Sequence, residues 1–154
     1  MVNNNCKIGE ALKTIVQILR KNTEVYVTGT LGLCLLDFAP EGYVPNDIDL
    51  KIEKGSMTKE LRAWFKEQEA IQGISRNEDY KDDTYTLNVK GVKVNVIVSD
   101  DTVEHLRLIS NFCNGMPLNI EHPFAILKEK DMLNRSKDKD FIISLINRLT
   151  SLYQ

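Results

Sequence analysis

Residues Val25 to Ile52 read VYVTGTLGLCLLDFAPEGYVPNDIDLKI, and this stretch decides the fold. A short apolar run ends in Gly29-Thr30, an apolar segment with helical spacing follows, and a loop of proline, glycine and asparagine comes next. The strand after that loop carries Asp47-Ile48-Asp49. Because alternate side chains of a strand share a face, Asp47 and Asp49 are expected to project together. Adjacent like charges need compensation, and a hard divalent cation prefers such a pair of oxygen ligands.

Length and composition limit the class of protein. The 154 residues predict a single domain over 1–154, with a core at about 24–100 and a helical part at about 101–154. Lys and Arg number 20 against 22 Asp and Glu, which excludes a globally basic surface for nucleic acid. The three cysteines are widely spaced and odd in number, which argues against a disulfide framework or a zinc knuckle.

Hydrophobic spacing predicts the other elements of the fold. The cysteine pattern and the lack of an apolar leader favour an intracellular, cytoplasmic protein. No apolar leader and no apolar run of transmembrane length is found, so no membrane association is expected. Ser56 is the expected N-cap of the third helix. Helices are expected over 6–21, 30–38, 57–68, 101–111, from His122-Pro123 onward and over 138–153. Strands are expected over 25–27, 74–80, 84–89, 92–98 and, as a short edge strand, 115–120.

In this order the elements resemble the nucleotidyltransferase superfamily, the domain shared by polymerase-beta-like enzymes and antibiotic nucleotidyltransferases. The family pattern is a strand, a Gly-Ser or Gly-Gly turn, a helix, and a strand with an acidic-x-acidic motif, with a third acid on a later neighbouring strand. Gly29-Thr30 matches the turn and keeps its hydroxyl, and Asp47 and Asp49 match the acidic pair. Asn95 fills the position of the third carboxylate.

The resemblance covers roughly residues 25–140 and implies an α/β (α+β) fold. This fold is a nucleotidyltransferase-like mixed β-sheet flanked by helices, with a helical C-terminus. A looser match lies in ILKEKDMLNRSKDKD, which is similar to a helix-loop-helix of small nucleotidyltransferases of the abortive-infection-toxin and lincosamide-modifying kinds. Its matching residues are Lys128, Arg135, Lys137 and Asp138.

The resemblance implies a metal-dependent enzyme that moves a nucleoside monophosphate from a nucleoside triphosphate to a hydroxyl on a small molecule, protein or RNA. Asp47 and Asp49 would hold Mg²⁺ or Mn²⁺. Gly29, Thr30 and the N-terminus of the following helix would hold the distal phosphates. A domain this small could also need a partner chain or a second copy of itself to bind substrate.

Two lysines are further candidates for phosphate contacts. Lys51 shares the face of the acidic pair if its strand continues regularly, and Lys93 shares the face of Asn95. Either ammonium could contact a phosphate, or it could remain in solvent.

Asn95 leaves the function open between three alternatives. An amide carries no charge and is no general base at neutral pH, and the loss of such a base typically costs on the order of 10²–10⁴ in rate. The chain is then an active transferase, a member of the same fold that binds nucleotide or a partner without catalysis, or an unrelated α/β interaction domain with a solvated acidic pair. Another acid could compensate for Asn95. The candidates are Asp79, Asp83, Asp100 and Asp101.

Overall fold

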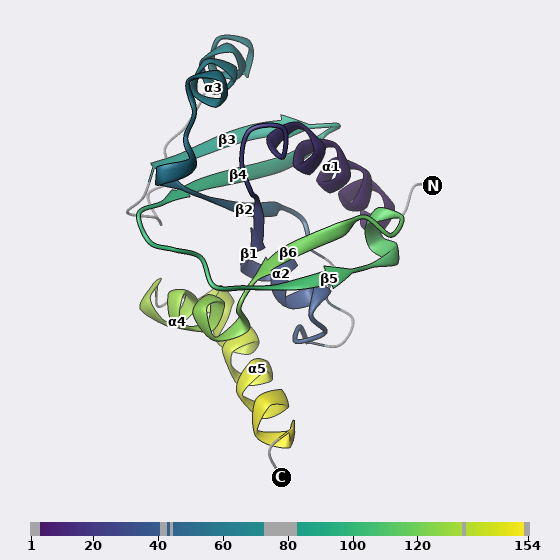
Figure 1. The fold of residues 1–154 in the computed structure, drawn as a ribbon. Helices are drawn as coiled ribbons and strands as arrows, with labels where there is room; N and C mark the ends of the chain where they lie inside the picture. The colour runs from purple at the N-terminus through teal and green to yellow at the C-terminus, as the bar shows by residue number, and fades with distance from the viewer. Residues whose placement is uncertain (1–3, 41–42, 44, 73–82, 134, 153–154) are drawn as a thin grey trace.

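The computed structural model describes residues 4–40, 43, 45–72, 83–133 and 135–152, and within these ranges the strands form one six-stranded sheet (Figure 1). The spatial order of the strands is β3-β4-β2-β1-β6-β5. The strands are β1 (Tyr26–Thr28), β2 (Ile48–Glu53), β3 (Asp83–Val89), β4 (Val92–Ser99), β5 (His105–Ile109) and β6 (Pro117–Glu121). The helices are α1 (Asn4–Leu19), α2 (Gly29–Leu35), α3 (Lys59–Gln72), α4 (Pro123–Leu133) and α5 (Lys139–Leu152). The strand predicted over 74–80 lies outside the described residues.

The sheet is mixed, and its short strand β1 lies near the centre. β1 runs antiparallel to β2 and parallel to β6, while β2 runs parallel to β4. The outer strands β3 and β5 are antiparallel to their neighbours. Because β1 ends where α2 begins, the turn between them opens in the middle of the sheet, and two strands flank it.

One face of the sheet is apolar, and α1 packs on it (Figure 1). Alternation along β2 and β4 turns three and four aliphatic side chains to this face, and burial of each contributes about 1.5–3 kcal/mol. From α3, Phe65 stacks on Tyr85 with ring centroids 4.2 Å apart. The buried set on this face includes Ile8, Leu12, Ile15, Leu19, Ile48, Leu50, Ile52, Val92, Val94, Val96 and Val98.

A second, smaller core joins α2 to the two C-terminal helices, which lie together below the sheet in Figure 1. Leu33, Ile126 and Phe141 form this core, one residue from each of α2, α4 and α5. Gly32 makes the approach possible, because a Cβ at this position would lie 3.1 Å from Ile126 and 3.3 Å from the carbonyl oxygen of Val27. α2 is therefore held between the sheet and α4.

The predicted helix over residues 101–111 is wrong, because residues His105–Ile109 form strand β5. The apolar spacing of this segment suits a helix, but Leu106 and Ile109 are 42% and 69% exposed at the edge of the sheet. The backbone instead pairs with β6, from His105 opposite Glu121 onward. Pairing with a distant strand overrides the local period here.

The position of one strand in the sheet and the residue that caps one helix also differ from the prediction. The strand expected at an edge over 115–120 is β6, and it lies inside the sheet between β1 and β5. α3 is capped by Thr58, whose hydroxyl accepts the N–H of Leu61 at 3.1 Å, and not by Ser56. Within the ranges described, no helix combines the length and the apolar character needed to cross a membrane.

Candidate functional site

Gly29 forms the turn from β1 into α2, and the carboxylate of Asp49 lies directly against it. The φ of Gly29 is 64°, in the left-handed region where a side chain is rarely accommodated. A Cβ built on Gly29 would lie 2.6 Å from Oδ2 of Asp49. Backbone conformation and the neighbouring carboxylate therefore both require glycine here, and the structure brings two of the predicted site residues together.

Asp49 lies in β2, whereas Asp47 precedes the strand and is exposed. Burial raises the pKa of Asp49, the hydrogen bond from Asn95 lowers it, and the charge of Asp47 raises it again, with the net direction upward. The two acids are thus close enough to influence each other. Asp47 faces solvent while Asp49 is the partly buried member of the pair.

Asn95 is the direct neighbour of Asp49, because the parallel pairing of β2 and β4 sets these two residues opposite each other. Nδ2 of Asn95 donates to Oδ1 of Asp49 at 2.9 Å, and Oδ1 of Asn95 accepts from the hydroxyl of Thr86 at 2.9 Å. Both contacts agree on one orientation of the amide. Asn95 therefore supplies a hydrogen-bond donor to Asp49 at the position where the family pattern has an anion.

Lys130 of α4 reaches Thr30, the residue after the glycine of this turn. Its Nζ donates to Oγ1 of Thr30 at 3.1 Å and to Oδ1 of Asp138 at 2.8 Å, and Arg135 donates to Oδ2 of Asp138 at 2.6 Å. Burial acts to raise the pKa of Asp138, but the hydrogen bonds and charges of Lys130 and Arg135 outweigh it and lower the pKa. A buried cation is thus fixed beside the Gly29 turn.

The resemblance of the C-terminal segment to other nucleotidyltransferases points to Lys128 and misses Lys130. Lys128 is exposed, and the side chain of Lys137 lies outside the described residues. Side chains two residues apart on a helix point in nearly opposite directions. Only one of Lys128 and Lys130 can therefore face the site. The signal that identifies Lys130 is its i+4 spacing from the apolar residue Ile126, which the structure buries on the same side of α4.

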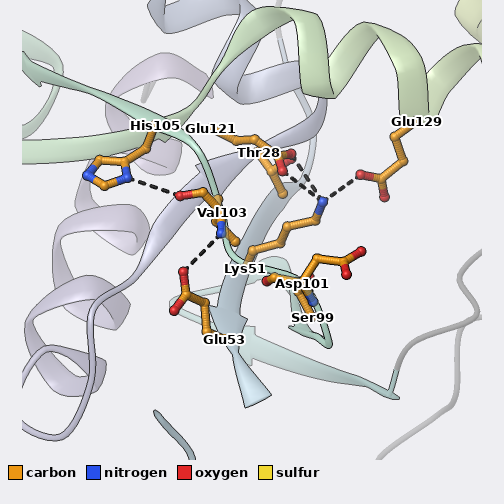
Figure 2. A network of polar contacts seen from close by, with 9 residues as sticks. All are labelled: Thr28, Lys51, Glu53, Ser99, Asp101, Val103, His105, Glu121 and Glu129. Carbon is orange, nitrogen blue, oxygen red and sulfur yellow. Dashed lines mark hydrogen bonds and ion pairs between the residues drawn. The ribbon is translucent and has the colours of Figure 1, made fainter. Parts of the chain in front are cut away.

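Lys51 and Lys93 have different surroundings. Lys93 is exposed, as a solvated lysine would be. Lys51 is buried, and its Nζ contacts the carboxylates of Glu121 and Glu129 at 2.9 and 2.7 Å (Figure 2). Thr28 donates to the same Glu121 at 2.6 Å. Of the two outcomes left open for Lys51, a position in solvent is therefore excluded, and both glutamates are neighbours of the site that the sequence pattern did not reveal.

The acids considered as substitutes for Asn95 lie elsewhere or outside the description. Asp100 and Asp101 follow the end of β4 and are exposed. This end pairs with Glu53 of β2, four residues beyond Asp49 and therefore roughly 13 Å along the strand. Asp79 and the side chain of Asp83 are outside the described residues. Neither of the described acids approaches Asp49.

An aromatic pair lies next to the acidic residues. The ring of Tyr43 meets Phe141 edge-on with centroids 4.5 Å apart, and Nζ of Lys130 lies 5.3 Å from the centroid of Phe141. Burial raises the pKa of Tyr43, and Cys34, Asp47, Asp138 and Asp49 raise it further. The half-exposed ring of Tyr43 is therefore close enough to these acids for their charges to act on its hydroxyl.

The side chains of this site that could hold a cation are carboxylates. Within the part of the chain that the structure describes, no three His, Cys, Asp or Glu side chains gather into a group that could hold a metal ion. Asp47 and Asp49 offer two carboxylates. Mg²⁺ commonly takes only one or two carboxylates from a protein and completes its shell with waters and substrate phosphates.

Comparison with known proteins supports the fold. No protein-family model matches the sequence, and no curated protein matches it either. Among solved structures, the chain is similar to a putative nucleotidyltransferase from Thermotoga maritima, with a TM-score of 0.59 over 90% of this chain and 92% of that chain. The two sequences are 16% identical, so the likeness concerns the fold alone. It confirms the predicted nucleotidyltransferase-like mixed α/β architecture.

Proposed function

We propose that this chain binds a nucleoside triphosphate together with Mg²⁺ or Mn²⁺ and transfers its nucleoside monophosphate to a hydroxyl acceptor. The observation that carries the proposal is the contact between Asp49 and the Gly29 turn. A phosphate can approach a glycine backbone closely. A cation on the adjacent carboxylate would then lie between the protein and the phosphate oxygens.

The described side chains divide the work of binding. Asp47 and Asp49 hold the cation, which when bound neutralises charge on the phosphates. Gly29 leaves room for the phosphates, and the hydroxyl of Thr30 can donate to one of them. Lys130, whose Nζ lies 3.1 Å from that hydroxyl oxygen, adds a fixed positive charge beside it.

A second candidate function is favoured by the hydrogen bond from Asn95 to Asp49. An amide is no base at neutral pH, so Asn95 cannot take the proton of an attacking hydroxyl, and it adds no charge to hold a second cation. The chain would then bind nucleotide, or a partner in response to nucleotide, and transfer little or nothing. Both candidates require the same triphosphate site, and they differ only in turnover.

Thermal unfolding with and without ligand tests the shared site. A ligand present at a hundred times its Kd raises the free energy of unfolding by about 2.7 kcal/mol, so triphosphate with Mg²⁺ should raise the unfolding temperature. Asp49→Asn should abolish this shift. Asp100→Asn, which removes an exposed carboxylate at the far end of β4, should retain it. Absence of a shift with all four ribonucleoside triphosphates would overturn both candidates.

Label transfer separates the two candidates. Triphosphate labelled at the α-phosphate is incubated with the chain and with hydroxyl acceptors of the three classes: small molecules, proteins and RNA. Incorporation that disappears in Asp47→Ala and Asp49→Ala supports the transferase. Binding with no incorporation in any class supports the second candidate.

A further inference from the structure

A buried charge network lies on the polar face of the sheet (Figure 2). It adjoins the proposed phosphate site but is not part of it. Lys51 is at its centre, and its Nζ is bonded to both carboxylate oxygens of Glu121, at 2.9 and 3.2 Å, and to Glu129 at 2.7 Å. Thr28 donates to Glu121 at 2.6 Å. The four residues come from β1, β2, β6 and α4, so the network ties three strands and one helix together.

Stability alone does not explain this network. The side chain of Lys51 is 10% exposed and that of Glu121 is 5% exposed, so both charges are removed from water. The desolvation cost often cancels the attraction, so that apolar residues of similar volume serve stability equally well or better. The network also sets one cation against two anions. A role in fixing geometry is therefore the better explanation.

Both ends of the network adjoin the proposed phosphate site in sequence. Thr28 immediately precedes Gly29, and Glu129 immediately precedes Lys130. These two neighbours on α4 reach two different elements, since Glu129 contacts Lys51 of β2 and Lys130 contacts Thr30 of α2. Through Glu121, Lys51 thus connects Thr28, the residue before the glycine turn, to Glu129, the residue before Lys130.

We propose that Lys51 is a positioning residue, which holds the Gly29 turn and the Lys130 ammonium at a fixed separation. The inference rests on the proposed function and deepens it: triphosphate affinity depends on Lys51 although Lys51 does not contact the triphosphate. Without this lysine, Glu121, which accepts from Thr28, loses its connection to Glu129 of α4. The phosphate site then loses its geometry while the apolar face of the sheet remains intact.

Glu129→Ala is the sharpest variant, because it removes the acceptor that links Lys51 to α4 and leaves the buried Lys51–Glu121 pair in place. Lys51→Met removes the centre of the network, and Lys51→Arg retains a cation there. Ile126→Val is the matched control, since it loosens the packing of α4 without touching any member of the network. Two quantities are measured for each: the affinity for triphosphate with Mg²⁺, and amide hydrogen exchange at Gly29 and Thr30 without ligand.

The network variants should weaken triphosphate binding by about ten- to a hundredfold and speed exchange at Gly29 and Thr30. Lys51→Arg should recover part of both. Ile126→Val should lower the unfolding temperature and leave affinity within about twofold. Unchanged exchange at the turn in folded Glu129→Ala, or equal loss of affinity in Ile126→Val, would overturn the inference. If the wild-type chain binds no triphosphate, the proposed function fails, and the exchange measurement still decides whether Lys51 positions the turn.

Discussion

At the scale of single residues, Gly29 meets two constraints that can be separated by experiment. Its φ of 64° is strained for any L side chain, and a Cβ would also meet the Asp49 carboxylate at 2.6 Å. Gly115 has a φ of 80°, but nothing lies within 4 Å of the position that a Cβ would take there, so it meets the first constraint only.

Gly29→Ala should therefore cost more stability than Gly115→Ala. Backbone strain alone costs on the order of 1–3 kcal/mol, and the clash with Asp49 adds to it only at Gly29. Urea unfolding of the two variants measures the difference. Equal losses in the two variants would show that the Asp49 carboxylate does not press on the turn.

Asn95 offers a second test at this scale, through its donated hydrogen bond to Asp49. Asn95→Asp replaces that donor with a carboxylate, so the free energy of unfolding at neutral pH should fall by about 1–3 kcal/mol in the absence of divalent cations. Mg²⁺ or Mn²⁺ should restore it, because a cation compensates the paired carboxylates. Unfolding curves with and without metal check this.

The control for Asn95→Asp is Asn88→Asp. Asn88 accepts from the N–H of Gly91 through its side-chain oxygen, and a carboxylate can do the same at this exposed turn. This variant should show little change and no dependence on divalent cations. If metal leaves the stability of Asn95→Asp unaltered, the neighbouring carboxylates do not form a cation site.

At the scale of elements, the spacing of apolar residues correctly predicted those helices and strands whose form depends on contacts within the segment itself. The alternation of β4 correctly put its valines on one face and Asn95 on the other, and this face holds the site. The residues of β5 have apolar spacing typical of a helix, but hydrogen bonding to the partner strand β6 stabilises the extended form more than that spacing stabilises a helix. Side-chain pairs across long separations, such as Lys130 with Thr30, leave no local pattern. The sequence therefore predicts the acidic pair and Arg135, but not Lys130.

The start of α3 gives a prediction at this scale. Thr58→Ala removes the hydroxyl that accepts the N–H of Leu61, so it should lower the free energy of unfolding by about 0.5–2 kcal/mol. Ser56→Ala, two residues earlier in a short 3-10 turn, should stay within about 0.5 kcal/mol of wild type. Denaturant unfolding of both variants decides which residue caps the helix. A larger loss from Ser56→Ala would return the cap to the residue that the sequence pattern suggested.

At the scale of the whole molecule, two cores meet at α2. The large core lies between α1 and the apolar face of the sheet, and the small one joins Leu33, Ile126 and Phe141. The buried pair of Lys130 and Asp138 lies at this second junction and ties α4 to the segment that leads into α5. The fold class could be predicted from sequence because the order of elements is local information. The docking of the C-terminal helices could not, since it depends on contacts between distant segments.

The acid stability of the molecule should depend on Asp138. Its pKa is lowered in the folded protein by Lys130 and Arg135 despite burial, so the folded state binds this proton more weakly than the unfolded chain does. The stability that it contributes is complete above the unfolded pKa of about 4 and is lost as pH falls toward the folded value.

Thermal unfolding of wild type and Asp138→Asn between pH 7 and pH 3 checks this dependence. The variant should unfold at a lower temperature near neutrality, and the two curves should converge below about pH 4. Asp131→Asn, which removes an exposed acid on α4, should follow the wild type throughout. A difference between wild type and Asp138→Asn that stays constant with pH would contradict the lowered pKa.

The central place of β1 has a consequence for the order in which the molecule is made. β1 pairs with β2, which leaves the ribosome soon after it, but its other neighbour, β6, is synthesised only after β3, β4 and β5. One side of β1 therefore stays unpaired while most of the chain is translated, and an unpaired strand invites wrong partners. The Gly29 turn at the end of β1 would then take its final form late in biosynthesis, once β6 has been inserted and α4 has packed against α2.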